Sequence, residues 1–122
     1  MSPTTAVLDT AVIDELRDLG RELEQDVLRE VIDAYRKLAP DLLSQMAESA
    51  SSRRFDALAR ASHTLKGGSA QIGAREVCEL ARAVEEIAKA GSDAGLAELI
   101  ARCRNAYRLV DAELRRAVEE ER

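Results

Sequence analysis

The sequence predicts an all-α protein, an antiparallel four-helix bundle with a short additional helix capping it at the N-terminus. Two observations carry this prediction. Apolar residues recur at alternating spacings of three and four along almost the whole chain, as on one face of a helix. Aromatic residues make up only 2% of the 122 residues, so the core has to consist of Leu, Val, Ile and Ala. A composition rich in these residues and in Glu and Arg favours helices over strands.

The first two elements are expected before residue 50. A short helix fits roughly Thr10 to Leu19, with Asp9 or Thr10 as its N-cap and Gly20 at its end. Proline lacks a backbone donor, so Pro40 should kink or break the second helix. The apolar stripe predicted to face the core on this second helix consists of Leu23, Val27, Val31, Ala34, Leu38 and Leu42.

Three further stripes follow, separated by short connections. The third consists of Phe55, Leu58, Ser62, Leu65, Ser69 and Ile72, and Gly73 marks its end. The fourth consists of Val77, Leu80, Val84 and Ile87, and the run from Ala90 to Gly95 stops it. The fifth consists of Leu96, Leu99, Cys103, Ala106, Val110 and Leu114. No repeat or long linker divides these elements, so we expect one domain over residues 1–122 with an ordered core at roughly 8–118.

Composition and charge exclude several classes of function. The net charge of −5 argues against nucleic acid as a partner. No apolar run approaches the roughly 20 residues of a membrane span, and the N-terminus has no secretory pattern. Cys78 and Cys103 suit buried thiols of a reducing cytoplasm, although their spacing leaves a disulfide open. Two cysteines and one histidine give no credible metal site.

The only histidine, His63, lies in a basic part of this acidic chain. From Arg53 to Arg75 there are five basic residues and one acidic residue, a local charge of +4. His63 is one step from the apolar seam, so its helix-surface neighbours are Ala59, Arg60, Lys66 and Gly67. This face is small and exposed, and its charge suggests a negatively charged group or partner.

Two consecutive glycines, Gly67 and Gly68, follow the histidine within the same predicted helix. Each costs about 0.8–1 kcal/mol relative to Ala in a helix interior. Gly67 lies directly beside His63 on the helix surface, and the missing side chain leaves a flat approach to the imidazole. Gly68 points elsewhere, and we assign it to close helix packing.

This arrangement suits nucleophilic transfer at the imidazole. A neutral imidazole has one protonated nitrogen and one nitrogen free to attack. Lys66 could pair with the oxygens of a transferring phosphoryl group. A carboxylate on the other ring nitrogen would hold the tautomer, and the fourth helix supplies Glu85 just off its seam. The chain contains no P-loop and no glycine-rich nucleotide motif.

The stretch "HTLKGGSAQIGA", from His63 to Ala74, resembles the signature of histidine-containing phosphotransfer (HPt) domains. The resemblance implies a monomeric phosphocarrier of a multistep two-component phosphorelay, phosphorylated on Nε2 of His63. It implies that Lys66 stabilises the phosphoryl group, that Gly67 admits the partner, and that Glu85 orients Nδ1. Expected contacts of the partner are Gly67, Arg60, Ala59, Ala70 and Gln71.

The resemblance also names the partners. They are response-regulator receiver domains and a (hybrid) histidine kinase, with no nucleic acid and no membrane. The chain itself should bind no cofactor and have no autonomous kinase activity, while Mg²⁺ is expected in the receiver domain. Two alternatives stay open, a non-catalytic helical adaptor and a phosphotransfer fragment of a chemotaxis-type kinase. The start at Met1 and the charged C-terminal end favour a stand-alone protein.

Overall fold

The computed structural model describes residues 7–120, and all regular structure in that range is helical. The helices are α1 (Thr10–Leu23), α2 (Val27–Ser51), α3 (Phe55–Ile72), α4 (Arg75–Lys89) and α5 (Leu96–Glu120). The predicted all-α class, with four bundle helices after a shorter first helix, is therefore confirmed.

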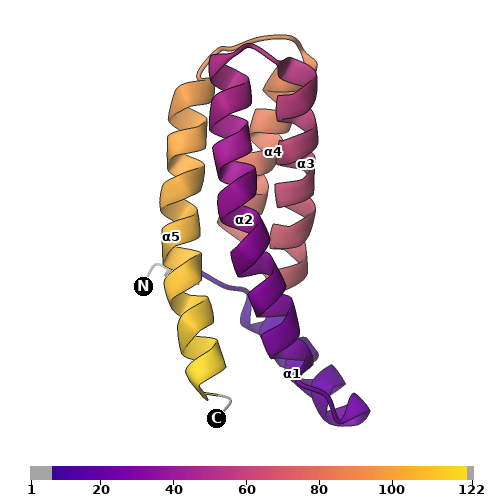
Figure 1. Cartoon of the computed structure of the whole chain (residues 1–122). Coiled ribbons are helices and arrows are strands. Elements are labelled where there is room, and N and C mark those ends of the chain that lie inside the picture. Colours follow the sequence, from indigo (N-terminus) through magenta and orange to yellow (C-terminus); the bar gives the residue numbers. More distant parts are fainter. Residues whose placement is uncertain (1–6, 121–122) are drawn as a thin grey trace.

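The four longer helices form an antiparallel bundle (Figure 1). Each packs against the helix before and the helix after it, and α5 returns beside α2 to close the bundle. Helix α1 covers the end of the bundle where α2 begins and α3 ends (Figure 1). The result is a continuous apolar core, and the outer faces of α3 and α4 are exposed to solvent.

Helix α3 follows the periodicity that its sequence predicts. Five of the six predicted seam residues are buried, and Phe55 at the helix start is half-buried. Two of these buried positions are serines, and both are satisfied by hydrogen bonds. Ser62 donates to the carbonyl of Leu58 at 2.8 Å, and Ser69 pairs with the hydroxyl of Tyr35 at 2.8 Å. Because the seam fixes the rotation of α3, it also fixes where His63 points.

The buried face of α2 is shifted by one residue from the predicted apolar stripe. Asp26 caps it by accepting from the backbone of Arg29, so the helix begins at Val27. Leu23 belongs to α1, and the predicted seam residue Leu38 is 44% exposed. The larger side chains of the adjacent stripe occupy the core because they bury more apolar surface. That stripe consists of Leu28, Ile32, Tyr35, Ala39, Leu42, Leu43 and Met46.

Gly20 and Pro40 both lie inside helices. Helix α1 continues to Leu23 and ends at Glu24, a left-handed residue with φ of 54°, so the prediction that Gly20 ends it is wrong. A Cβ on Gly20 would lie 2.7 Å from the carbonyl oxygen of Gln25, so glycine is needed there for close packing. Pro40 does not split α2, which runs unbroken to Ser51 and bends along its length (Figure 1).

The turn between α3 and α4 is where glycine's backbone freedom is required. Gly73 has φ of +79°, and a Cβ there would lie 3.1 Å from the carbonyl oxygen of Asp9. The Gly73 carbonyl accepts from the backbone N–H of Asp9 at 2.8 Å. Arg75 adds an ion pair to the Asp9 side chain at 3.0 Å. These contacts hold the start of α1 on the end of α3.

Candidate functional site

His63 stands on the outer face of α3, with 67% of its side chain exposed. Its Nδ1 lies 3.0 Å from Oε2 of Glu85 on α4. Within residues 7–120 the Nε2 atom has no hydrogen-bond partner. One ring nitrogen is therefore held by the protein, and the other faces solvent.

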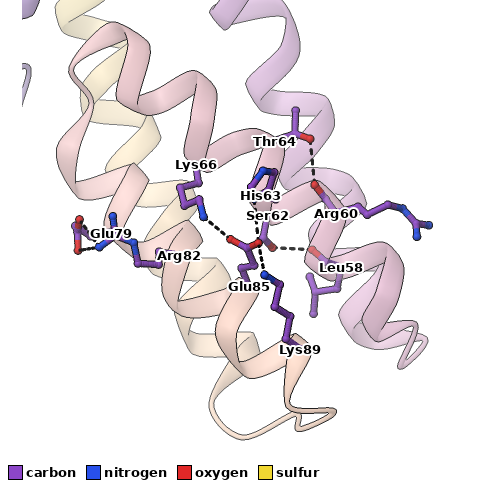
Figure 2. A network of polar contacts seen from close by, with 10 residues as sticks. All are labelled: Leu58, Arg60, Ser62, His63, Thr64, Lys66, Glu79, Arg82, Glu85 and Lys89. Carbon is purple, nitrogen blue, oxygen red and sulfur yellow. Dashed lines mark hydrogen bonds and ion pairs between the residues drawn. The ribbon is translucent and has the colours of Figure 1, made fainter.

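Glu85 is the buried centre of this site. It follows Val84 on the face of α4 that packs on α3, and only 4% of its side chain is exposed. Three donors surround the carboxylate. Besides Nδ1 of His63, the Lys66 ammonium lies 2.8 Å from Oε1 and the Lys89 ammonium lies 3.1 Å from Oε2. Figure 2 shows His63 and Lys66 reaching it from α3 and Lys89 from α4. A buried carboxylate is tolerated because each oxygen is satisfied.

The donors determine the charge of Glu85. Burial alone would raise the pKa of this carboxyl, but hydrogen bonds from Lys66, Lys89 and His63 outweigh it and lower the pKa to about 2. Glu85 is therefore ionised near neutral pH and only accepts hydrogen bonds. Nδ1 of a neutral His63 must then carry the proton, which leaves the lone pair on Nε2.

Lys89 is a site residue that the sequence interpretation missed. It lies four residues after Glu85 on the same helix, and the two form an i,i+4 ion pair. Glutamate followed four residues later by lysine is a pattern that the sequence alone contains. Glu86, the next residue on α4, is exposed, so Glu85 is the one of these two neighbouring carboxylates that is buried.

The two glycines differ in their surroundings. A Cβ built on Gly67 meets no atom within 4 Å, so nothing within the described structure requires glycine there. A Cβ on Gly68 would make ordinary contact with the Tyr35 ring at 3.5 Å. Gly68 thus packs against α2, and Gly67 opens onto solvent beside His63.

The remaining candidate contacts surround His63 on α3. Arg60 and Ala70 are exposed and Ala59 is half-buried, and Figure 2 shows the Arg60 side chain pointing away from Glu85. Gln71 and Gly68 line a groove between α3 and α2. Its other wall comes from α2 residues that include Val31, Ala34 and Leu38. Val31, Ala34 and Leu38, which the sequence predicted in the core, thus border this open groove.

Within residues 7–120 the cysteines and acidic residues form no second candidate site. Cys78 and Cys103 are free, and burial raises the pKa of the Cys103 thiol to about 12. In the part of the chain that the structure describes, no three His, Cys, Asp or Glu side chains gather as ligands for a metal ion. No helix in residues 7–120 combines the length and the apolar character needed to cross a membrane.

The chain is a four-helix bundle with an exposed histidine that a buried carboxylate holds through Nδ1. Residues 30–120 match the family model described as Hpt domain, and the chain belongs to this family. This confirms the resemblance found in the "HTLKGG" stretch.

The fold agrees with a solved structure of the same class. The chain is similar to histidine-containing phosphotransfer protein B (HptB) from Pseudomonas aeruginosa PAO1, with a TM-score of 0.85 and 20% sequence identity. The match covers 98% of this chain and 100% of that protein. A comparison with curated proteins gives no match. At 20% identity this structural similarity establishes the fold alone.

Proposed function

We propose that this chain is the phosphocarrier of a multistep two-component phosphorelay, taking a phosphoryl group onto Nε2 of His63 from one receiver-domain aspartate and passing it to another. The observation that carries the proposal is the Nδ1 contact with Glu85. That contact leaves the lone pair on the exposed nitrogen, where another protein can reach it.

The transfer step follows from this geometry. The Nε2 lone pair forms the new N–P bond, and the P–O bond to the aspartate breaks with its electron pair leaving on the carboxylate oxygen. The Nδ1 proton stays in place, so the ring becomes a cation. The ionised Glu85 stabilises this positive charge through its contact at 3.0 Å. The return transfer reverses these bond changes.

Lys66 would act on the phosphoryl oxygens. Its ammonium rests on Oε1 of Glu85 and is one helical turn from His63. About a quarter of its side chain is exposed, at 27%, so it can turn outward as the phosphoryl group arrives. A lysine there offsets the charge of the transferring group.

The surface around His63 suits a docking partner. Gly67 leaves the approach to the ring open, and the groove lined by Gln71 and Leu38 offers apolar surface between α3 and α2. We assign the receiver domain to this face, with Arg60, Ala59 and Ala70 at its edge. In this proposal Mg²⁺ and the aspartate belong to the receiver, and ATP is not the phosphoryl donor.

The test is to mix the purified chain with a receiver domain phosphorylated with labelled phosphate. Label should move to the wild-type chain and not to His63→Gln, and ATP alone should leave the chain unlabelled. Label that stays on the receiver, or that reaches His63→Gln equally, contradicts the proposal. Activity in a cell that survives His63→Gln would favour the non-catalytic adaptor.

A further inference from the structure

One carboxylate oxygen of Glu85 is shared by two donors, His63 and Lys89. Oε2 of Glu85 accepts from Nδ1 of His63 at 3.0 Å and lies 3.1 Å from Nζ of Lys89. Oε1 is occupied separately by Lys66 at 2.8 Å. Two donors on one oxygen compete for its charge, so each interacts with it less strongly than it would alone.

Lys89 acts on the site through Glu85. Its side chain is 66% exposed, so it adds little to the core. It shares a helix with Glu85 at i,i+4, so the pair forms whether or not α3 is in contact. While Lys66 rests on Glu85, Lys89 adds a second positive charge to the carboxylate.

The state of the ring decides how long a phosphoryl group stays on Nε2. A ring that keeps the Nδ1 proton carries positive charge while phosphorylated, and it leaves phosphorus as a neutral imidazole. In hydrolysis, water forms the new P–O bond and the P–Nε2 bond returns its electron pair to Nε2. Both protons of the water leave with the phosphate. A carboxylate that stabilises the ring cation therefore stabilises the phosphorylated state against loss of the phosphoryl group.

We propose that Lys89 is a positioning residue that limits how far Glu85 stabilises the cation of phosphorylated His63 and so shortens the lifetime of the phosphohistidine. The inference rests on the proposed function, because it concerns the same phosphorylated ring. Lys89 withdraws part of the Oε2 charge from Nδ1, and its own positive charge opposes the ring cation. The phosphorylated ring is thus less stable and gives up its phosphoryl group more readily.

Three variants separate this role from a general effect of charge. Lys89→Gln removes the ammonium, and Lys89→Arg keeps a cation in its place. Arg82→Gln removes one positive charge from the same helix at a residue that pairs with Glu79 instead of Glu85. Both positions, Lys89 and Arg82, are exposed, and circular dichroism checks that the helices remain.

The chains are loaded with phosphoramidate, a small phosphoryl donor, so that no receiver is needed. The decay of the phosphohistidine is followed by ³¹P NMR at neutral pH. The half-life of Lys89→Gln should be about threefold longer than that of the wild type, the effect of one screened unit charge at this range. Lys89→Arg and Arg82→Gln should keep the wild-type half-life. Equal half-lives for Lys89→Gln and Arg82→Gln, or a long one for Lys89→Arg, would overturn the proposal.

A second readout uses the chain without phosphate. His63 is the only histidine, so its two ring nitrogens give the only imidazole signals in a long-range ¹H–¹⁵N spectrum. Lys89→Gln should move the Nδ1 signal, because Oε2 of Glu85 then accepts from His63 alone, and unchanged shifts contradict the role of Lys89. A chain that shows both Lys89 effects but takes no phosphate from receivers would refute the proposed function alone.

Discussion

The ammonium of Lys66 lies 2.8 Å from Oε1 of Glu85, so the lysine expected to meet the phosphoryl group is bound to a carboxylate before transfer. Lys66 therefore has to exchange one anionic partner for another. Glu85 keeps Lys89 when this happens, at 3.1 Å on its other oxygen, so its buried charge stays compensated. The site can thus respond to an incoming phosphoryl group without uncovering an unpaired charge.

Lys66→Gln should slow phosphoryl transfer from a receiver by about tenfold, because a charge-assisted contact to the phosphoryl oxygens is lost. The loss is moderate because the wild-type lysine first has to leave Glu85. Rapid-quench measurement of labelled phosphate gives the rate. Lys37→Gln, an exposed lysine on α2, is the matched control and should leave the rate unchanged. Equal rates for the two variants would show that Lys66 does not act on the phosphoryl group.

Gly67→Ala should stabilise the protein by about 0.8–1 kcal/mol, because a Cβ there meets nothing within 4 Å and alanine favours the helix. Gly67→Gln should keep the helix but slow transfer, since its side chain covers the approach to His63. Urea unfolding and the transfer assay measure the two effects. Gly73→Ala is the contrasting control and should destabilise the fold, because Gly73 is left-handed and tightly packed. Unchanged transfer in Gly67→Gln would refute the open-approach argument.

Glu85→Ala should lower the transfer rate by about 10- to 100-fold, because both the Nδ1 acceptor and the charge that stabilises the ring cation are lost. Glu85→Gln should lose less, since its amide oxygen can still accept from Nδ1. The difference between the two variants separates orientation from charge. If both reach the wild-type rate, the contact between His63 and Glu85 has no role in transfer.

The stability of the protein should fall in acid partly through Glu85. The pKa of this carboxyl is about 2 in the folded protein and 4.5 ordinarily, so the unfolded chain binds its proton more readily. The contribution of Glu85 is complete above about pH 4.5 and is lost as the pH falls toward 2. Urea unfolding of wild type and Glu85→Gln at pH 6, 4 and 2.5 should give a stability difference that shrinks with pH. A difference that stays constant would contradict the ionised, ion-paired Glu85.

The sequence predicted α3 more accurately than α2, for a physical reason. In α3 a single apolar stripe at alternating spacings leaves one possible rotation, so His63 was correctly predicted on the outer face. In α2 two adjacent stripes are both apolar, one with Val31 and Leu38 and one with Ile32 and Leu43. Periodicity cannot choose between them, and tertiary packing buries the second.

The site was predictable where it lies along one helix and less so where it joins two. His63, Lys66 and Gly67 share α3, so their spacing alone places them together. Glu85 is on α4, and its contact with His63 depends on how the turn at Gly73 sets the two helices. The role of Lys89 emerges only once Glu85 is known to be buried, although the i,i+4 pattern is readable in advance.

The central claim is that Nε2 of His63 carries the phosphoryl group, and ring-nitrogen NMR of the phosphorylated chain tests it most directly. The chain is labelled with ¹⁵N, incubated with a phosphorylated receiver domain, and examined through its single imidazole. We expect a phosphorus coupling on Nε2 and a proton-bearing Nδ1 that still contacts Glu85. A phosphoryl group on Nδ1, or an imidazole that remains unmodified while the receiver loses its phosphate, would contradict the account.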